Sequence, residues 1–227
     1  EGIPNLSPVT LLQVIGMGVL FALLSIFFCR MMHAAPKIYD KYLPNHLVRA
    51  AVGGGLIIAL TYLVWLWNPG SYDYNGAGEA VIHAAIGGQA RPEAFFFKML
   101  FTTITLGAGF KGGEIVPVFF TGATFGCTVA PLLGLHPSFG AGLGMVCVFC
   151  GVTNCPISSL LLSLELFAGD SLGMFTGQSL CLFAVCLAVS YMLSGYYGLY
   201  SEQKIVYSKL RPEFINKKAN EEENHEG

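Results

Sequence analysis

Long apolar stretches without a charged side chain dominate the chain. No Asp, Glu, Lys or Arg occurs at residues 2–29, 50–72, 115–164 or 171–201. A helix that crosses a bilayer uses about 20 mostly apolar residues, so each of these stretches is long enough for a crossing. The hydropathy pattern therefore predicts several membrane-spanning helices.

Gly, Pro and polar residues divide the apolar stretches into segments. We expect spans at about Leu11–Cys29, Ala50–Trp67 and Pro92–Leu106. The segment 78–88 is apolar but too short to cross a bilayer. Further apolar segments lie at about 117–135, 139–151, 156–167, 172–193 and 199–210.

The breaks between these segments indicate a binding site. Backbone N–H and C=O groups at membrane depth must be paired, so irregular backbone survives only inside protein or beside an aqueous cavity. A helix that begins there presents free N–H groups and the positive end of its dipole, which favour an anion. The interrupted pattern around residues 107–117 therefore predicts an anion site.

The third span also carries polar side chains. Lys98 is predicted to reach a polar boundary or to pair with a helix end rather than to touch substrate. The hydroxyls of Thr102, Thr103 and Thr105 are predicted to donate to carbonyl groups of their own helix.

The composition supports the membrane assignment. Apolar residues make up 54% of the chain and charged residues 11%, with a mean hydropathy of +0.60, whereas soluble domains carry about 25% charged residues. The net charge is −2 and no basic patch is present, so no nucleic-acid partner is expected. The bilayer is the expected environment.

Enzymatic and metal chemistry find little support. The sequence contains no HExxH or GxSxG motif and no paired intramembrane carboxylates, so we expect a non-enzyme without catalytic residues. Cys147 and Cys150 have a CxxC spacing, but they lie in an apolar segment without a neighbouring His, which favours a structural role. Neither a metal site nor a cofactor is expected.

The sequence GGEIVP at residues 112–117 resembles the GGxFxP-type loop that opens an ion-binding helix in the second half of CLC chloride-channel superfamily proteins. Three further matches keep their order. Lys98 lies 16 residues before Glu114, the segment Asn154–Glu165 resembles a short broken helix, and GLYS at 198–201 resembles the start of the last helix. The resemblance spans about residues 11–211.

The resemblance implies an all-α polytopic membrane protein with tilted and broken transmembrane helices, in which this chain is one half of a CLC-type inverted repeat. It implies an anion bound by the backbone at Gly113, Glu114 and Ile115 and by the hydroxyl of Tyr200. It also implies a homodimer. The gating Glu of a GxExP motif, which belongs to the first half of such proteins, is not found here, so we expect the missing N-terminal half to be a partner.

Two positions depart from the chloride-channel pattern. Glu114 replaces an apolar residue and Ile115 replaces the Phe. Gly-Gly-Glu at this loop is similar to the fluoride/proton antiporter branch, which makes Glu114 the proton-coupling candidate. An alternative is that Glu114 only complements the helix dipole. For Tyr200 the alternative is a place in the aromatic belt at the membrane interface.

We therefore expect anion transport, by fluoride/proton antiport with fluoride and protons as the transported species. A voltage-gated chloride channel or chloride/proton exchanger of the same family is the alternative, and an intramembrane enzyme is the alternative from another class. We expect a transmembrane region at 1–210 and a polar, partly disordered tail at 211–227. Lys204, Lys209 and Arg211 favour a cytoplasmic C-terminus in the cell membrane.

The first apolar run is interpreted as a membrane span rather than a signal peptide, because the chain opens on Glu1 and lacks a basic segment before the run. We interpret the chain as part of a longer protein.

Overall fold

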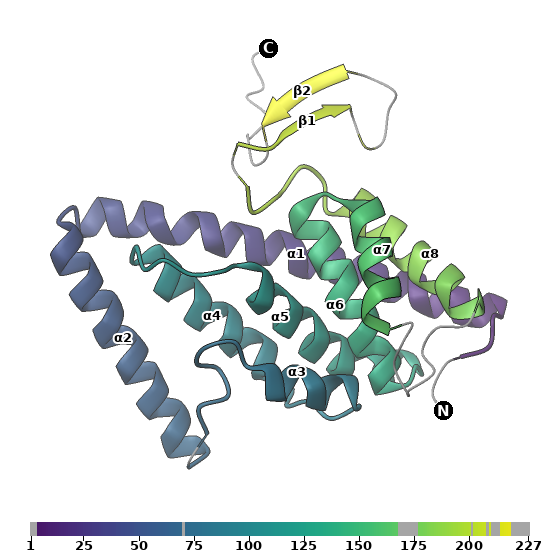
Figure 1. The fold of residues 1–227 in the computed structure, drawn as a ribbon, viewed down its shortest axis with the longest axis horizontal. Coiled ribbons are helices and arrows are strands. Elements are labelled where there is room, and N and C mark those ends of the chain that lie inside the picture. The colour runs from purple at the N-terminus through teal and green to yellow at the C-terminus, as the bar shows by residue number, and fades with distance from the viewer. Residues whose placement is uncertain are drawn as a thin grey trace.

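The computed structural model of the chain describes residues 4–69, 71–167, 177–200, 202–207, 209 and 214–218. Within them the fold is a bundle of helices with a small hairpin near the C-terminus (Figure 1). The elements are α1 (Pro8–Tyr42), α2 (His46–Trp67), α3 (Glu79–Ile86), α4 (Ala94–Gly107), α5 (Ile115–Val129), a 3-10 turn (Ala130–Leu133), α6 (Pro137–Thr153), α7 (Pro156–Phe167), α8 (Gly177–Leu193), β1 (Lys204–Tyr207) and β2 (Phe214–Lys218). The predicted helical class is confirmed.

The helices have unequal lengths, as the broken hydropathy pattern predicted. In the part of the chain that the structure describes, three segments are long and apolar enough to cross a membrane: α1, α2, and α5 continued through the 3-10 turn to Leu133. The helices α4, α6, α7 and α8 are apolar but shorter. Short apolar helices at membrane depth require protein or water around their ends, which is the arrangement expected of broken spans.

Helix α1 is longer than predicted. The expected span ended at Cys29, but the helix continues through Pro36 to Tyr42. Met32, Ala35 and Tyr39 in this extension are buried, at spacings of three and four residues, while its charged residues are exposed. The extension is thus amphipathic, and its charges ended the apolar run without ending the helix.

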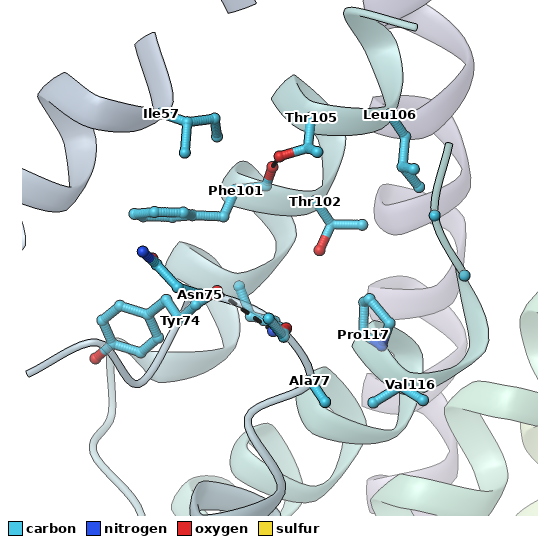
Figure 2. Close-up of a pocket in the computed structure, with 14 residues that line it drawn as sticks. Ile57, Tyr74, Asn75, Ala77, Phe101, Thr102, Thr105, Leu106, Val116 and Pro117 are labelled. Carbon is cyan, nitrogen blue, oxygen red and sulfur yellow. Dashed lines mark hydrogen bonds between the residues drawn. The ribbon is translucent and has the colours of Figure 1, made fainter. Parts of the chain in front are cut away.

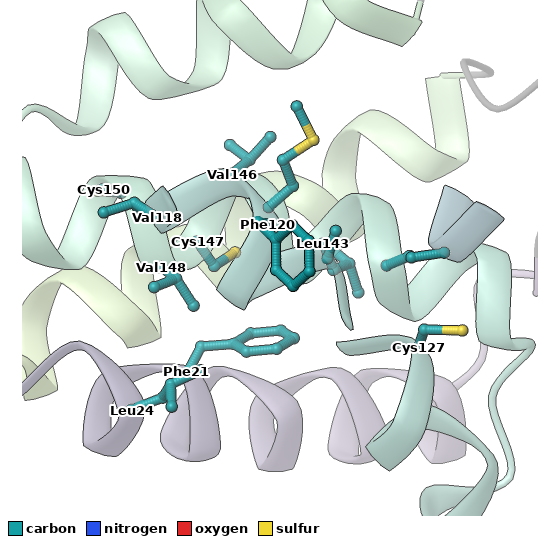
Figure 3. Packing of buried hydrophobic residues seen from close by; sticks show 14 of the residues in the cluster. Phe21, Leu24, Val118, Phe120, Cys127, Leu143, Val146, Cys147, Val148 and Cys150 are labelled. Atoms are coloured by element: carbon teal, nitrogen blue, oxygen red, sulfur yellow. The ribbon is translucent and has the colours of Figure 1, made fainter. Parts of the chain in front are cut away.

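Helices α5 and α6 form the centre of the bundle, with α1 beside both of them. Phe21 of α1, Val118 and Phe120 of α5 and Leu143 of α6 contribute to the buried cluster that Figure 3 shows. The buried apolar core therefore surrounds the helix whose first residues were predicted to bind the anion.

Two glycine pairs let α5 and α6 approach closely. A Cβ built at Gly126 would lie 2.0 Å from the carbonyl oxygen of Gly140, and one built at Gly144 would lie 2.1 Å from that of Gly122. No side chain fits these gaps. Within each helix the two glycines have the GxxxG spacing that places both on one face, Gly122 with Gly126 on α5 and Gly140 with Gly144 on α6.

Helix α2 stands apart from this core at the edge of the bundle (Figure 1). Only Gly53 and Val64 of its residues are buried. Many of its large apolar side chains are exposed, as expected of a helix that faces lipid or further protein.

The C-terminal segment departs from the expected helix. The resemblance implied a helix that starts near Leu199, but residues 204–207 form β1, which pairs antiparallel with β2 in the register Lys204 to Lys218. The β-branched Ile205 and Val206 favour a strand. The predicted boundary between 210 and 211 stays a prediction. Of the tail predicted to be disordered, 211–213 and 219–227 lie outside the described residues.

Candidate anion-binding site

The loop between α4 and α5 contains the predicted anion-binding residues. Helix α4 ends at Gly107, and Gly109 adopts a positive φ of 94°, which residues other than glycine rarely adopt. The N–H of Phe110 donates to the carbonyl of Thr105 at 3.3 Å and closes this turn. The chain then has no regular secondary structure until α5 begins at Ile115, so the helical structure is interrupted where the resemblance placed the site.

Five consecutive backbone N–H groups at this helix start are free. Among the described residues, none of the N–H groups from Gly112 to Val116 donates a hydrogen bond, whereas that of Val118 donates to the carbonyl of Glu114. Gly112, Gly113 and Ile115 are exposed on the surface of this chain. Free amides at the positive end of a helix dipole form an anion-binding arrangement.

Glu114 is the residue that precedes α5, and its side chain does not cap the helix. It is half-buried, and it lies near His33 and Cys29 of α1. The Nδ1 of His33 lies 2.8 Å from the carbonyl oxygen of Cys29. The imidazole of His33 is therefore a second ionisable group near the Glu114 carboxyl, and the sequence pattern did not connect it to the loop.

Arg49 of α2 anchors the other end of the loop. Its Nε donates to the carbonyl oxygen of Gly107 at 3.0 Å, and a second guanidinium nitrogen donates to the same oxygen. The guanidinium also forms an ion pair with Asp40, and its carbon lies 5.5 Å from the centroid of the Tyr39 ring. The C-terminus of α4 is therefore held where the loop begins.

Arg49→Met is expected to lower the free energy of unfolding by about 1–2 kcal/mol, because a charged donor to a helix C-terminus is removed. Asp40→Asn should have an effect below about 1 kcal/mol, since the Asp40 carboxyl is 67% exposed and exposed ion pairs contribute little. Thermal unfolding of the two purified variants compares them. Equal losses would contradict the role given to the bond with Gly107.

Lys98 does not reach a polar boundary. It is 1% exposed, and its ammonium donates to the carbonyl oxygens of Tyr74 at 3.3 Å and of Gly76 at 2.5 Å. It also lies 4.9 Å from the centroid of the Phe120 ring. The predicted pairing with a helix end is replaced by bonds to a loop, because the segment between α2 and α3 folds back against α4.

A cavity of about 510 Å³ adjoins both Lys98 and the loop between α4 and α5 (Figure 2). This loop, residues 108–114, is called the anion loop below. Its wall includes Thr102 of α4 and the backbone of Gly112 and Gly113. The prediction for the threonines was correct for Thr105, which donates to the carbonyl of Phe101 at 2.7 Å. It was wrong for Thr103, whose hydroxyl contacts the sulfur of Met32 at 3.7 Å.

Tyr200 lies on a segment fastened to the end of α6. The N–H of Leu199 donates to Val152 at 2.9 Å, and the amide side chain of Gln203 donates to the carbonyl of Thr153 at the same distance. Asn154 ends α6 with a positive φ of 58°, and its side chain donates to the carbonyl of Tyr197 at 3.0 Å. Hydrogen bonds to residues 152–154 at the end of α6 thus hold the chain on both sides of Tyr200.

Lys209 adds to this attachment. Its ammonium donates to the side-chain oxygen of Asn154 at 2.6 Å and to the carbonyl of Tyr191 at 2.9 Å. Cys29 of α1 lies near both Lys209 and Glu114. The Tyr200 segment and the anion loop therefore flank the same part of α1, although no described contact joins Tyr200, which is 47% exposed, to Glu114.

Comparison with known proteins places the chain in a family. Residues 2–195 match the family described as "Voltage gated chloride channel". This match covers most of the chain, and the chain belongs to this family. With its apolar helices, it is a multi-pass membrane protein.

Among curated relatives, the "Chloride/fluoride channel protein" of Pseudomonas syringae pv. tomato is 32% identical over 204 residues, which cover 88% of this chain and 43% of the relative. The "H(+)/Cl(-) exchange transporter ClcA" of Vibrio cholerae serotype O1 is 26% identical over 174 residues, which cover 72% of this chain and 36% of the relative. This chain therefore spans less than half the length of either protein.

A solved structure of a protein from the CLC group has a similar fold. The "Crystal structure of a CLC-type fluoride/proton antiporter" superposes with a TM-score of 0.78 at 26% identity, covering 87% of this chain and 47% of that protein. The predicted resemblance to one half of a CLC-type protein is confirmed at the level of the fold.

Proposed function

We propose that the protein containing this chain transports anions across the cell membrane by exchanging fluoride for protons. The observation that carries the proposal is the run of free N–H groups from Gly112 to Val116 beside the carboxyl of Glu114. Partial charges on backbone amides hold an anion without trapping it, which suits a transport site better than a positive side chain does.

Fluoride and a carboxyl group fit this arrangement together. Fluoride is small and strongly hydrated, so its desolvation must be offset by close hydrogen-bond donors. A protonated Glu114 adds a donor next to the amides, and the ionised form repels the anion. Fluoride occupancy and the protonation state of one residue are thereby coupled, as an intramembrane carboxyl suggests. For exchange, the proton and the anion leave the site toward opposite sides of the membrane. In this proposal Gly113, Glu114, Ile115 and the Tyr200 hydroxyl surround the anion.

The second candidate is chloride transport, by a channel or a chloride/proton exchanger. It is favoured by the similarity to a relative named as an H(+)/Cl(-) exchange transporter. The apolar residue typical of the chloride branch is absent at position 114, where this chain has Glu, and for that reason fluoride is the first candidate.

Anion efflux from liposomes that contain the full-length protein tests the choice. We expect fluoride to leave at least about tenfold faster than chloride, a difference of about 1.4 kcal/mol in barrier height. An opposed proton gradient should drive fluoride uphill. Protein-free liposomes give the background leak. Chloride efflux as fast as fluoride efflux would refute the fluoride assignment and leave the chloride candidate.

We further propose how the protein assembles and on which side of the membrane its C-terminus lies. The rest of the protein is proposed to complete the pathway, since this chain spans less than half of its relatives. A homodimer is supported by α7, where Ile157 and Leu161 are 76% and 59% exposed. The basic residues Lys204 and Lys209 after α8 support a cytoplasmic C-terminus. Transport rather than catalysis is the proposed activity.

A further inference from the structure

The cavity next to the anion loop is much larger than a halide ion requires. Its volume of about 510 Å³ lies in the range of pockets that bind organic ligands. Apolar side chains such as Ile57, Phe101 and Leu106 form much of its wall (Figure 2). Among the described residues, Lys98 is the one charged residue that lines it. A ligand that fills it must be largely apolar and carry at most a small polar group.

The polar groups of the cavity suit an anionic group. Thr102 is only 8% exposed, and Figure 2 shows its hydroxyl directed into the cavity. Within the described part of the chain this hydroxyl has no hydrogen-bond partner. The Lys98 ammonium is bound only by carbonyl groups and an aromatic ring, so its charge has no carboxylate partner among the described residues. A carboxylate in the cavity would accept a hydrogen bond from the Thr102 hydroxyl and lie near the Lys98 charge.

A second, largely apolar hollow lies beside this cavity along α2. It measures about 430 Å³, is lined by Tyr62 and Trp65 among others, and shares Ile57 and Asn75 with the first cavity. The outer face of α2 here is exposed, with Ile58 and Tyr62 at 71% and 60% exposure. The two hollows together form a track with a polar inner end and an apolar outer end.

We propose that this track binds a single-chain amphiphile with a carboxylate head group, a fatty acid. The Thr102 hydroxyl donates to the carboxylate, the Lys98 charge attracts it, and the acyl chain lies along α2 past Trp65. A carboxylate at this place lies beside Gly112 and Gly113, so it competes electrostatically with an anion at the free amides. This slowing of transport rests on the proposed function, whereas the binding does not.

Fluorescence quenching by a dibrominated fatty acid tests the binding, because bromine quenches a tryptophan that it contacts. The full-length protein in detergent is titrated with the probe, and the quenching lost in Trp65→Phe is assigned to Trp65. We expect this component to saturate and to be reversed by the unbrominated fatty acid. Thr102→Val, which keeps the side-chain shape, should weaken binding about tenfold, as expected for loss of a hydrogen bond to a charged group.

Thr105→Val is the matched control. Thr105 lines the same cavity, but its hydroxyl already donates to the carbonyl of Phe101, so its variant should bind like the unchanged protein. The brominated methyl ester, which lacks the charge, should bind about tenfold more weakly than the acid.

Two binding results would overturn the proposal. Equal quenching by acid and ester, unaffected by Thr102→Val, would identify ordinary lipid contact with α2. Absence of a saturable Trp65 component would show that another part of the protein fills the track. Quenching requires no transport, so it is measurable even if fluoride exchange is disproved. In the liposome assay, saturating fatty acid should slow efflux, and less so in Thr102→Val; unchanged efflux would refute the regulatory role.

Discussion

Glu114→Gln is expected to abolish the coupling of fluoride to protons and to slow fluoride efflux about ten- to hundredfold. The amide keeps the shape of the side chain and can still donate a hydrogen bond, but it cannot release a proton. The charged form that expels the anion is therefore lost, and the anion leaves the site more slowly. A fluoride electrode records efflux from liposomes, and an imposed proton gradient tests uphill fluoride movement.

Glu165→Gln is the control for this experiment. Glu165 lies near the end of α7 and is also a carboxylate on an apolar helix, but its side chain is exposed. We expect normal rate and coupling from this variant. If Glu114→Gln exchanged protons for fluoride at an undiminished rate, the carboxyl would serve only to complement the dipole of α5.

Gly126→Ala is expected to lower the free energy of unfolding by about 3 kcal/mol, the upper end of the usual cost of overpacking. The new Cβ would lie 2.0 Å from the carbonyl oxygen of Gly140, and a backbone atom cannot move aside without displacing α6. The midpoint of thermal unfolding should fall by about 2–4 °C for each kcal/mol lost.

Gly55→Ala provides the comparison, because a Cβ at Gly55 of α2 would meet nothing within 4 Å. Its unfolding midpoint should stay unchanged or rise slightly, since alanine favours the helix more than glycine does. Equal midpoints for Gly126→Ala and the unchanged protein would mean that α5 and α6 separate more easily than their contact indicates.

The sequence predicted the helices better than their ends. Charge-free runs located most of them, because burial in hydrocarbon requires apolar residues over a whole segment. The same criterion ended the first helix at Cys29, although α1 continues to Tyr42 on an amphipathic pattern with Tyr39 buried. For the segment after Leu199, resemblance suggested a helix, but pairing between β1 and β2 depends on residues from the two ends of the hairpin, such as Lys204 and Lys218.

The candidate site was located by the sequence only in part. The break at Gly112–Pro117 predicted a helix start with free N–H groups, and α5 begins there. The start of α5 could be predicted because glycine and proline restrict or release the backbone of adjacent residues only. The approach of His33 to Glu114 was not foreseen, since these residues belong to different helices. The GxxxG spacings at Gly122 and Gly140 were a signal that the sequence carried and that could have identified the α5–α6 contact.

By itself, the sequence determined that this chain belongs to a membrane protein and that it is helical, and it predicted that one helix starts where an anion could bind. These properties follow from composition and from residues adjacent in the chain. Only the tertiary structure decided that Lys98 is bound by loop carbonyls and that Thr102 faces a cavity without a partner. The hydrogen-bond partner of a buried polar group is whichever acceptor or donor comes within about 3 Å of it, and the packing of segments distant in the sequence decides this.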